Sequence, residues 1–151
     1  MARTFRYSLD RRIINRVIMW LLRSGFTPGN YYLLSVAGRR TGNIHTVPVV
    51  LVREGNKQWL VAPYGEVDWV KNARASKVVR LSRGRQNVDY AIRQLPPESS
   101  ASILKKYLVE NPITRPYFNA REDASLAEFV EEAKDKYVFE LIKTSTGEAD
   151  V

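Results

Sequence analysis

The sequence predicts a protein that is mainly β with helices (α+β), built on a small barrel or a strongly curled antiparallel sheet. Six short segments are rich in β-branched and aromatic residues or alternate between apolar and polar residues, and turn residues join most of them as hairpins. Segments with helical spacing of apolar residues stand only at the start, at a crossover and towards the end. Closing such a sheet into a barrel removes its exposed edges.

Turn residues mark the boundaries of the expected helices and strands along the chain. Glycine, asparagine and proline clusters interrupt the chain at 25–30, 38–43, 54–57, 84, 96–97 and 111–112. Strands are expected at 31–36, 47–52, 58–62, 77–83, 86–93 and 136–143. Helices are expected at about 9–24, late in the segment 63–74, at 98–110 and at 125–134.

Length and composition indicate one domain that covers residues 1–151. The chain is 44% hydrophobic and 26% charged, and at this size it buries roughly two-thirds of the surface that its unfolded form exposes. No apolar run approaches the ~20 residues that a membrane-spanning helix needs, and no signal peptide is evident, so we expect a cytoplasmic location. The absence of cysteine and the single histidine, His45, exclude a thiolate or multi-histidine metal site, and we predict no metal.

Positive charge is concentrated in the first two-thirds of the chain. Residues 1–97 contain 17 of the 24 Lys and Arg against five acidic residues, a balance of +12, whereas the remainder carries −4. Such a field favours an anionic ligand, nucleic acid or an anionic membrane surface.

The predicted helix at 9–24 is basic and amphipathic. Its apolar residues repeat with helical spacing, and its arginines fall mainly outside that stripe. One interpretation is a peripheral helix at the inner face of the membrane. The other is a helix that packs on its own domain.

The loop 38–42 is the main candidate for binding. Gly38 and Gly42 permit a tight turn, from which Arg39 and Arg40 project, and Thr41 adds a hydroxyl. Such a turn suits an anion. A simple hairpin with solvated arginines explains the same residues.

Several segments, taken in order, resemble one protein family over most of the chain. An apolar strand ends in Gly38-Arg39-Arg40-Thr41-Gly42 and is followed by His45 and Pro48. Arg53-Glu54-Gly55-Asn56 then leads to Trp59-Leu60-Val61-Ala62, and Trp69 and Asn72 match a W-x-x-N segment. Together they resemble the deazaflavin-dependent nitroreductases, also described as quinone reductases that use reduced coenzyme F420.

This resemblance implies a split β-barrel, FMN-binding-like, with about six antiparallel strands. It implies hydride transfer from reduced coenzyme F420 to a quinone, nitro or activated-alkene acceptor, which is a small hydrophobic molecule. The 38–42 loop would receive the phosphate or acidic tail of the cofactor. The implied cofactor-binding residues are Arg39, Arg40, Thr41, Gly42, His45, Pro48, Pro63, Tyr64, Gly65, Trp69 and Asn72.

Two departures from the family pattern affect the expected cofactor contacts. The position of His45 is commonly arginine in the family. At Pro63 and Tyr64, relatives often carry a serine and a lysine, so this chain lacks an N–H and a cation there. No catalytic residue is identified; Tyr64 and Tyr117 are candidate donors to the substrate, or tyrosines that pack in the core.

Other functions remain open at this point. A branch of the family is proposed to bind fatty acids, so a non-catalytic lipid or cofactor carrier of the same fold is the main alternative. FMN could replace F420, or no cofactor could bind. Arg80, Arg83 and Arg85 near Tyr90 raise a nucleic-acid interpretation, although no recognised motif supports it. The sequence makes no prediction of oligomeric state.

Overall fold

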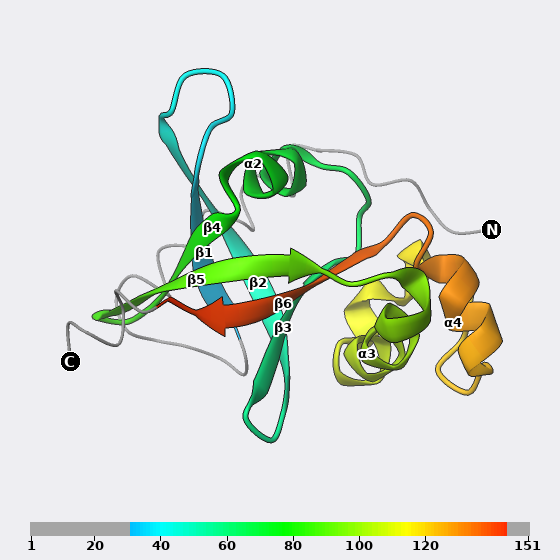
Figure 1. Cartoon of the computed structure of the whole chain (residues 1–151). Helices are drawn as coiled ribbons and strands as arrows, with labels where there is room; N and C mark the ends of the chain where they lie inside the picture. Colours follow the sequence, from blue (N-terminus) through cyan, green and yellow to red (C-terminus); the bar gives the residue numbers. More distant parts are fainter. Residues whose placement is uncertain (1–30, 145–151) are drawn as a thin grey trace.

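The computed structural model describes residues 31–144, so the helix expected at 9–24 lies outside the described residues. Six antiparallel strands form a closed barrel, and helices lie around it (Figure 1). The strands are β1 (Tyr31–Ala37), β2 (Ile44–Glu54), β3 (Lys57–Ala62), β4 (Val78–Arg83), β5 (Gln86–Gln94) and β6 (Tyr137–Lys143). The helices are α2 (Asp68–Ser76), α3 (Pro97–Glu110), the 3₁₀ helix η1 (Pro112–Tyr117) and α4 (Leu126–Glu132).

The strand order around the barrel is β1-β2-β3-β6-β5-β4, and β4 pairs back with β1 to close it. Three hairpins supply the neighbours β1–β2, β2–β3 and β4–β5. The last strand, β6, enters between β3 and β5 and completes the sheet. All six strands are therefore paired on both sides, which confirms the barrel predicted from the hairpin pattern.

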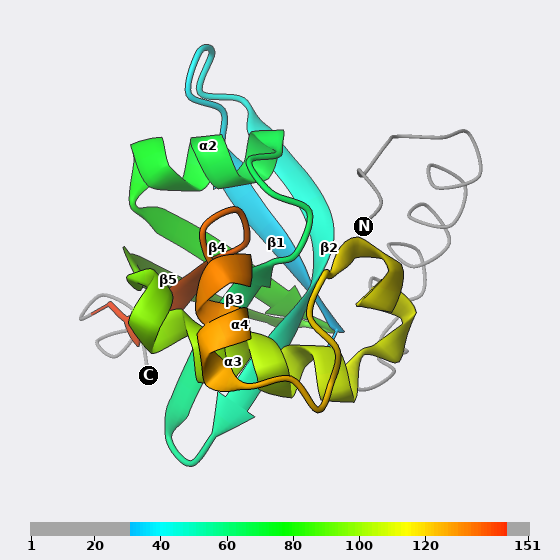
Figure 2. The same ribbon diagram turned by 90° about the vertical axis from the view of Figure 1, so that its right-hand side faces the viewer.

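Successive side chains of each strand point to opposite faces of the sheet, and this alternation creates two separate hydrophobic cores. Side chains such as Leu34, Leu60 and Phe139 fill the inside of the barrel. The opposite faces of β2, β3 and β6 contribute Val52, Trp59 and Val138 to a second core, shared with α3 and α4. In Figure 2, α2 lies above the barrel, and α3 and α4 lie against its side.

Three helix boundaries follow from local chemistry. Pro97 begins α3, where its missing N–H costs no helical hydrogen bond. Ser125 caps α4, and its Oγ accepts a hydrogen bond from the N–H of Glu128 at 3.4 Å. The α-helical part of α4 ends at Glu132, earlier than the expected limit at residue 134, because the chain turns there towards β6.

The segment after α3 differs from the expectation of a simple break. Asn111 ends α3, but residues 112–117 continue as η1. Pro112 is compatible with the start of a new helix and accounts for the interruption. Within the described part of the chain, no helix has both the length and the apolar character to cross a membrane.

Candidate functional site

The turn between β1 and β2 has a defined internal structure. The N–H of Gly38 donates to the carbonyl of Asn43 at 2.7 Å, and the N–H of Gly42 donates to the carbonyl of Gly38 at 2.9 Å. Gly42 has a φ of 78°, a conformation that favours glycine. The hydroxyl oxygen of Thr41 accepts from the N–H of Asn43 at 3.2 Å. The N–H of Gly42 is therefore used inside the turn, and Gly42 shapes the loop.

Asn72 anchors this turn to α2. Its Oδ1 accepts hydrogen bonds from the backbone N–H of Arg39 at 3.1 Å and from Nη1 of the same residue at 2.8 Å. Asn72 is buried, with 5% of its surface exposed. Asp68, at the start of α2, adds an ion pair with Arg39 at 3.7 Å. The W-x-x-N segment thus places its asparagine against the basic loop.

The remaining side chains of the loop face solvent. Arg40 and Thr41 are exposed, and so is His45 at the start of β2. The ring of His45 lies close to the backbone of Gly38, since a Cβ at that glycine would stand 2.9 Å from Nε2 of the histidine. The structure therefore brings Arg39, Arg40, Thr41 and His45 together at one end of the barrel.

The segment that precedes α2 forms a second part of the candidate site. Pro63 is buried and Tyr64 is half-buried. The rings of Tyr64 and Tyr117 meet edge to face, with centroids 4.9 Å apart and an angle of 77° between the ring planes. Gly65 lies against the turn before β6, where a Cβ would stand 3.5 Å from the carbonyl oxygen of Asp135.

These contacts assemble two residues that are 53 positions apart in the sequence, the two candidate donors Tyr64 and Tyr117. The same segment is tied to α2, because Glu66 forms an ion pair with Arg74. α2 is consequently joined to the basic loop through Asn72 and to the segment that carries Tyr64 through Arg74.

Two further candidates occupy different positions. Trp69 is half-buried and its ring packs towards Phe139 of the barrel core, with centroids 6.2 Å apart. Pro48 lies three residues beyond His45, about 10 Å along β2, and alternation puts it on the opposite face of the sheet. The register pairs β2 with β3 only from Leu51 onward, so Pro48 stands where a residue without an N–H is tolerated.

The basic hairpin of β4 and β5 buries the aromatic ring on which the nucleic-acid interpretation relied. Tyr90 points into the barrel core and is buried, so its ring is covered by other side chains. Arg80 pairs with Asp89 across the hairpin at 2.7 Å. The hydrogen bonds from Arg80 lower the pKa of Asp89, and the same contact raises the pKa of Arg80.

One group near the site was missed by the sequence analysis. Glu132 and Lys136 form a buried ion pair with 2.8 Å between Oε2 and Nζ. Their i, i+4 spacing is the only sequence signal, and that spacing is common on solvated helix faces. Burial of both charges became visible only in the folded chain.

Solved structures share this fold. One, described as a domain-swapped dimer, is 20% identical, covers 89% of this chain and 99% of its own, and has a TM-score of 0.56. An F420-H2-dependent reductase is 24% identical over 74% of this chain and 93% of its own, with a TM-score of 0.52. A putative 5-nitroimidazole antibiotic resistance protein from Bacteroides thetaiotaomicron is 12% identical over 95% and 84%, with a TM-score of 0.51. The fold is thus the FMN-binding-like split β-barrel.

The sequence itself identifies the family. Residues 23–133 match the family model described as F420H(2)-dependent quinone reductase. The chain belongs to this family, and it is an oxidoreductase that uses F420H2. Among curated proteins, none matches this chain in sequence. The fold and cofactor expected from the resemblance are confirmed, whereas the individual site residues stay predictions.

Proposed function

We propose that the protein transfers a hydride from F420H2 to a small hydrophobic acceptor of the quinone type, at a site bounded by the 38–42 loop, α2 and the Tyr64–Tyr117 pair. Nitro compounds and activated alkenes are the further acceptor classes. The observation that carries this proposal is the hydrogen bonding of Arg39 by Asn72, which fixes a basic loop beside α2.

The chemistry of the loop suits the anionic part of F420. Arg40 supplies an exposed cation, and Thr41 retains a hydroxyl proton after its oxygen has accepted from Asn43. His45 adds ring nitrogens at the same end of the barrel. The N–H groups of Arg40 and Thr41 stand outside the hydrogen bonds that build the turn. A phosphate or carboxylate would be held by charge-assisted hydrogen bonds there.

The deazaflavin ring supplies the hydride when the cofactor is bound. The protein contributes orientation and polarity at the acceptor. The edge-to-face rings of Tyr64 and Tyr117 form an aromatic surface, and a flat acceptor can pack against it. A tyrosine hydroxyl that donates to the acceptor oxygen stabilises negative charge as it develops there. Pro63, Gly65 and Trp69 shape the backbone and the neighbouring surface.

The first experiment is a titration of the purified protein with F420H2 and, separately, with FMN, followed by addition of menadione while the absorbance of the reduced cofactor is recorded. Saturable F420H2 binding and menadione-dependent oxidation are expected. Binding of a fatty acid without either signal would contradict the proposal and favour a lipid carrier. Preferential binding of FMN would contradict the cofactor assignment.

Arg40→Ala tests the loop within that assay. We expect weaker F420H2 binding by about 1–3 kcal/mol, the contribution of a charge-assisted contact. Arg85→Ala is the matched control. Arg85 is an exposed arginine in the turn between β4 and β5, so this variant loses the same charge at a position far from the 38–42 loop. Equal losses in the two variants would show a general charge effect and remove Arg40 from the site.

A further inference from the structure

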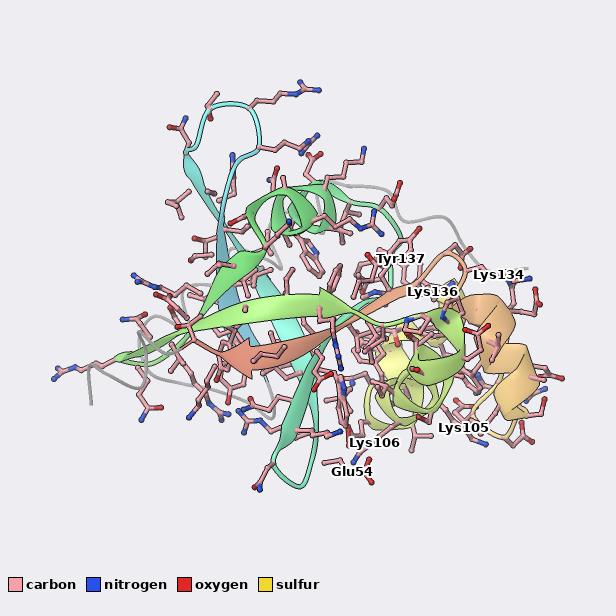
Figure 3. The ribbon with its side chains drawn as sticks, viewed as in Figure 1. Glu54, Lys105, Lys106, Lys134, Lys136 and Tyr137 are labelled. Carbon is pink, nitrogen blue, oxygen red and sulfur yellow. The ribbon has the colours of Figure 1, made fainter. Side chains whose placement is uncertain are left out.

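Two adjacent ion pairs at the end of α4 differ sharply in burial. Glu131 and Lys134 are 68% and 62% exposed, whereas the side chains of Glu132 and Lys136 are only 2% and 6% exposed. Figure 3 labels both lysines, which lie on the turn that leads from α4 into β6. Burying two charges carries a desolvation cost, and well-packed uncharged residues often stabilise a fold as well. The desolvation cost of the buried pair must therefore be offset by the contacts that its two side chains make.

The buried pair holds the segment that follows η1. Oε1 of Glu132 accepts from the backbone N–H groups of Asn119 and Ala120, at 2.5 and 2.6 Å. Nζ of Lys136 lies 5.0 Å from the centroid of the Phe118 ring. A carboxylate and an ammonium on one turn thus fix three consecutive residues, 118–120, by hydrogen bonds and a cation–π contact.

Tyr117 immediately precedes this fixed segment. Its ring meets that of Tyr64 edge to face. The residue after Tyr64, Gly65, lies beside the same turn, where a Cβ added to the glycine would stand 3.5 Å from the carbonyl oxygen of Asp135. Each tyrosine is therefore next in the chain to a residue that lies beside residues 132–136.

We propose that the Glu132–Lys136 ion pair is a positioning device that fixes the Tyr64–Tyr117 pair and thereby sets the affinity for the hydrophobic acceptor. The inference rests on the proposed function, in which these tyrosines line the acceptor side of the site. Glu132 and Lys136 act through the 118–120 segment and the turn, and the cofactor end lies at the 38–42 loop. Loss of the pair should consequently affect the acceptor much more than F420H2.

The test is the double variant Glu132→Gln/Lys136→Met, which removes both charges at nearly constant side-chain size. We expect the KM for menadione to rise about threefold to tenfold, the effect of losing about one hydrogen bond, while the KM for F420H2 changes by less than about twofold. The control is Glu131→Gln/Lys134→Met, which removes the exposed pair of the same types from the same turn. It should leave both KM values unchanged.

A structural readout is independent of catalysis. Nuclear magnetic resonance should detect contacts between the ring protons of Tyr64 and Tyr117, and slow exchange of the amides of Asn119 and Ala120, in the unmodified protein. The buried-pair variant should weaken the ring contacts and speed the exchange. Lys136→Met alone keeps the carboxylate that accepts from the two amides and removes the ion pair and the cation–π contact with Phe118, so weaker ring contacts with little change in amide exchange are expected if the double variant folds poorly.

The outcomes separate the two proposals. Absence of F420H2 oxidation by the unmodified protein would refute the proposed function, whereas the resonance measurements would still test the support of the tyrosine pair. Unchanged ring contacts in the buried-pair variant would overturn the positioning role. Equal rises in the KM for menadione and for F420H2 would also overturn it, because they would indicate a general loss of structure.

Discussion

Replacement of Asn72 by alanine tests how the W-x-x-N segment acts. Asn72→Ala deletes an oxygen that accepts two hydrogen bonds from Arg39, one from the backbone and one from the charged guanidinium. A neutral hydrogen bond contributes about 0.5–1.5 kcal/mol and one to a charged group about 1.5–3 kcal/mol. Because the loop is exposed, water compensates for part of these hydrogen bonds. We therefore expect the free energy that holds the loop in its binding conformation to fall by about 1–2 kcal/mol.

The assay is the dissociation constant for F420H2, measured by titration. A loss of about 1–2 kcal/mol corresponds to binding about 5- to 30-fold weaker. Asn56→Ala is the matched control, because Asn56 is an exposed asparagine in the turn between β2 and β3. The control should bind F420H2 as the unmodified protein does. Thermal unfolding of each variant establishes that it is folded at the assay temperature.

A double-mutant cycle with Arg39→Ala decides whether Asn72 acts through the loop. Arg39→Ala removes the guanidinium bond to Asn72 and keeps the backbone N–H bond, so the two changes share one interaction. If Asn72 acts by positioning Arg39, the losses of F420H2 affinity in the double variant should therefore be clearly less than additive. Fully additive losses would refute this reasoning and indicate that Asn72 contacts the cofactor itself. An unchanged affinity in Asn72→Ala would show that the loop keeps its conformation without the anchor.

Three further predictions concern stability and the loop. Phe129→Ala should lower the free energy of unfolding by about 3–5 kcal/mol in a denaturant titration, because Phe129 is fully buried between the helices and the barrel; a loss below about 1 kcal/mol would contradict the second core. The lowered pKa of Asp89 means that its pair with Arg80 stabilises the fold above the unfolded pKa of about 3.9 and loses that effect as pH falls through the lower folded pKa. The difference in stability between the unmodified protein and Asp89→Asn should therefore be a few tenths of a kcal/mol at neutral pH and vanish in acid, as for an exposed pair; a difference that grows in acid would contradict it. Gly38→Ala should weaken F420H2 binding severalfold, because its Cβ would stand 2.9 Å from the His45 ring and 3.2 Å from the carbonyl of Asn43; unchanged binding would show that the loop adapts.

The strands and the barrel could be predicted because their signals are local. Hairpin turns and period-two alternation placed all six strands to within a few residues, and a closed sheet follows when few edges can stay exposed. The pairing of β6 between β3 and β5 could not be derived in this way. It depends on which face of β6 completes the two cores, and that is decided by packing between residues distant in the sequence.

The candidate site was predictable as a set of residues but not as a set of contacts. The sequence indicated Arg39 and Asn72 separately, and the structure joins them by two hydrogen bonds. η1 was missed because a proline signals a break in a helix without specifying the conformation of the next residues. The burial of Glu132 was missed because a charged residue near a helix end is ordinarily solvated.

The contact between the Tyr64 and Tyr117 rings suggests what the departures from the family pattern at Pro63 and Tyr64 do. A lysine at position 64 would bring a flexible cation to this point, whereas Tyr64 brings a flat ring that packs against Tyr117. Pro63 is buried and fixes its own backbone angle just before that ring. At this position the chain therefore has a packed aromatic pair in place of a cation. Tyr64→Lys should therefore raise the KM for menadione much more than it changes F420H2 binding, and a larger change in F420H2 binding would place Tyr64 on the cofactor side of the site.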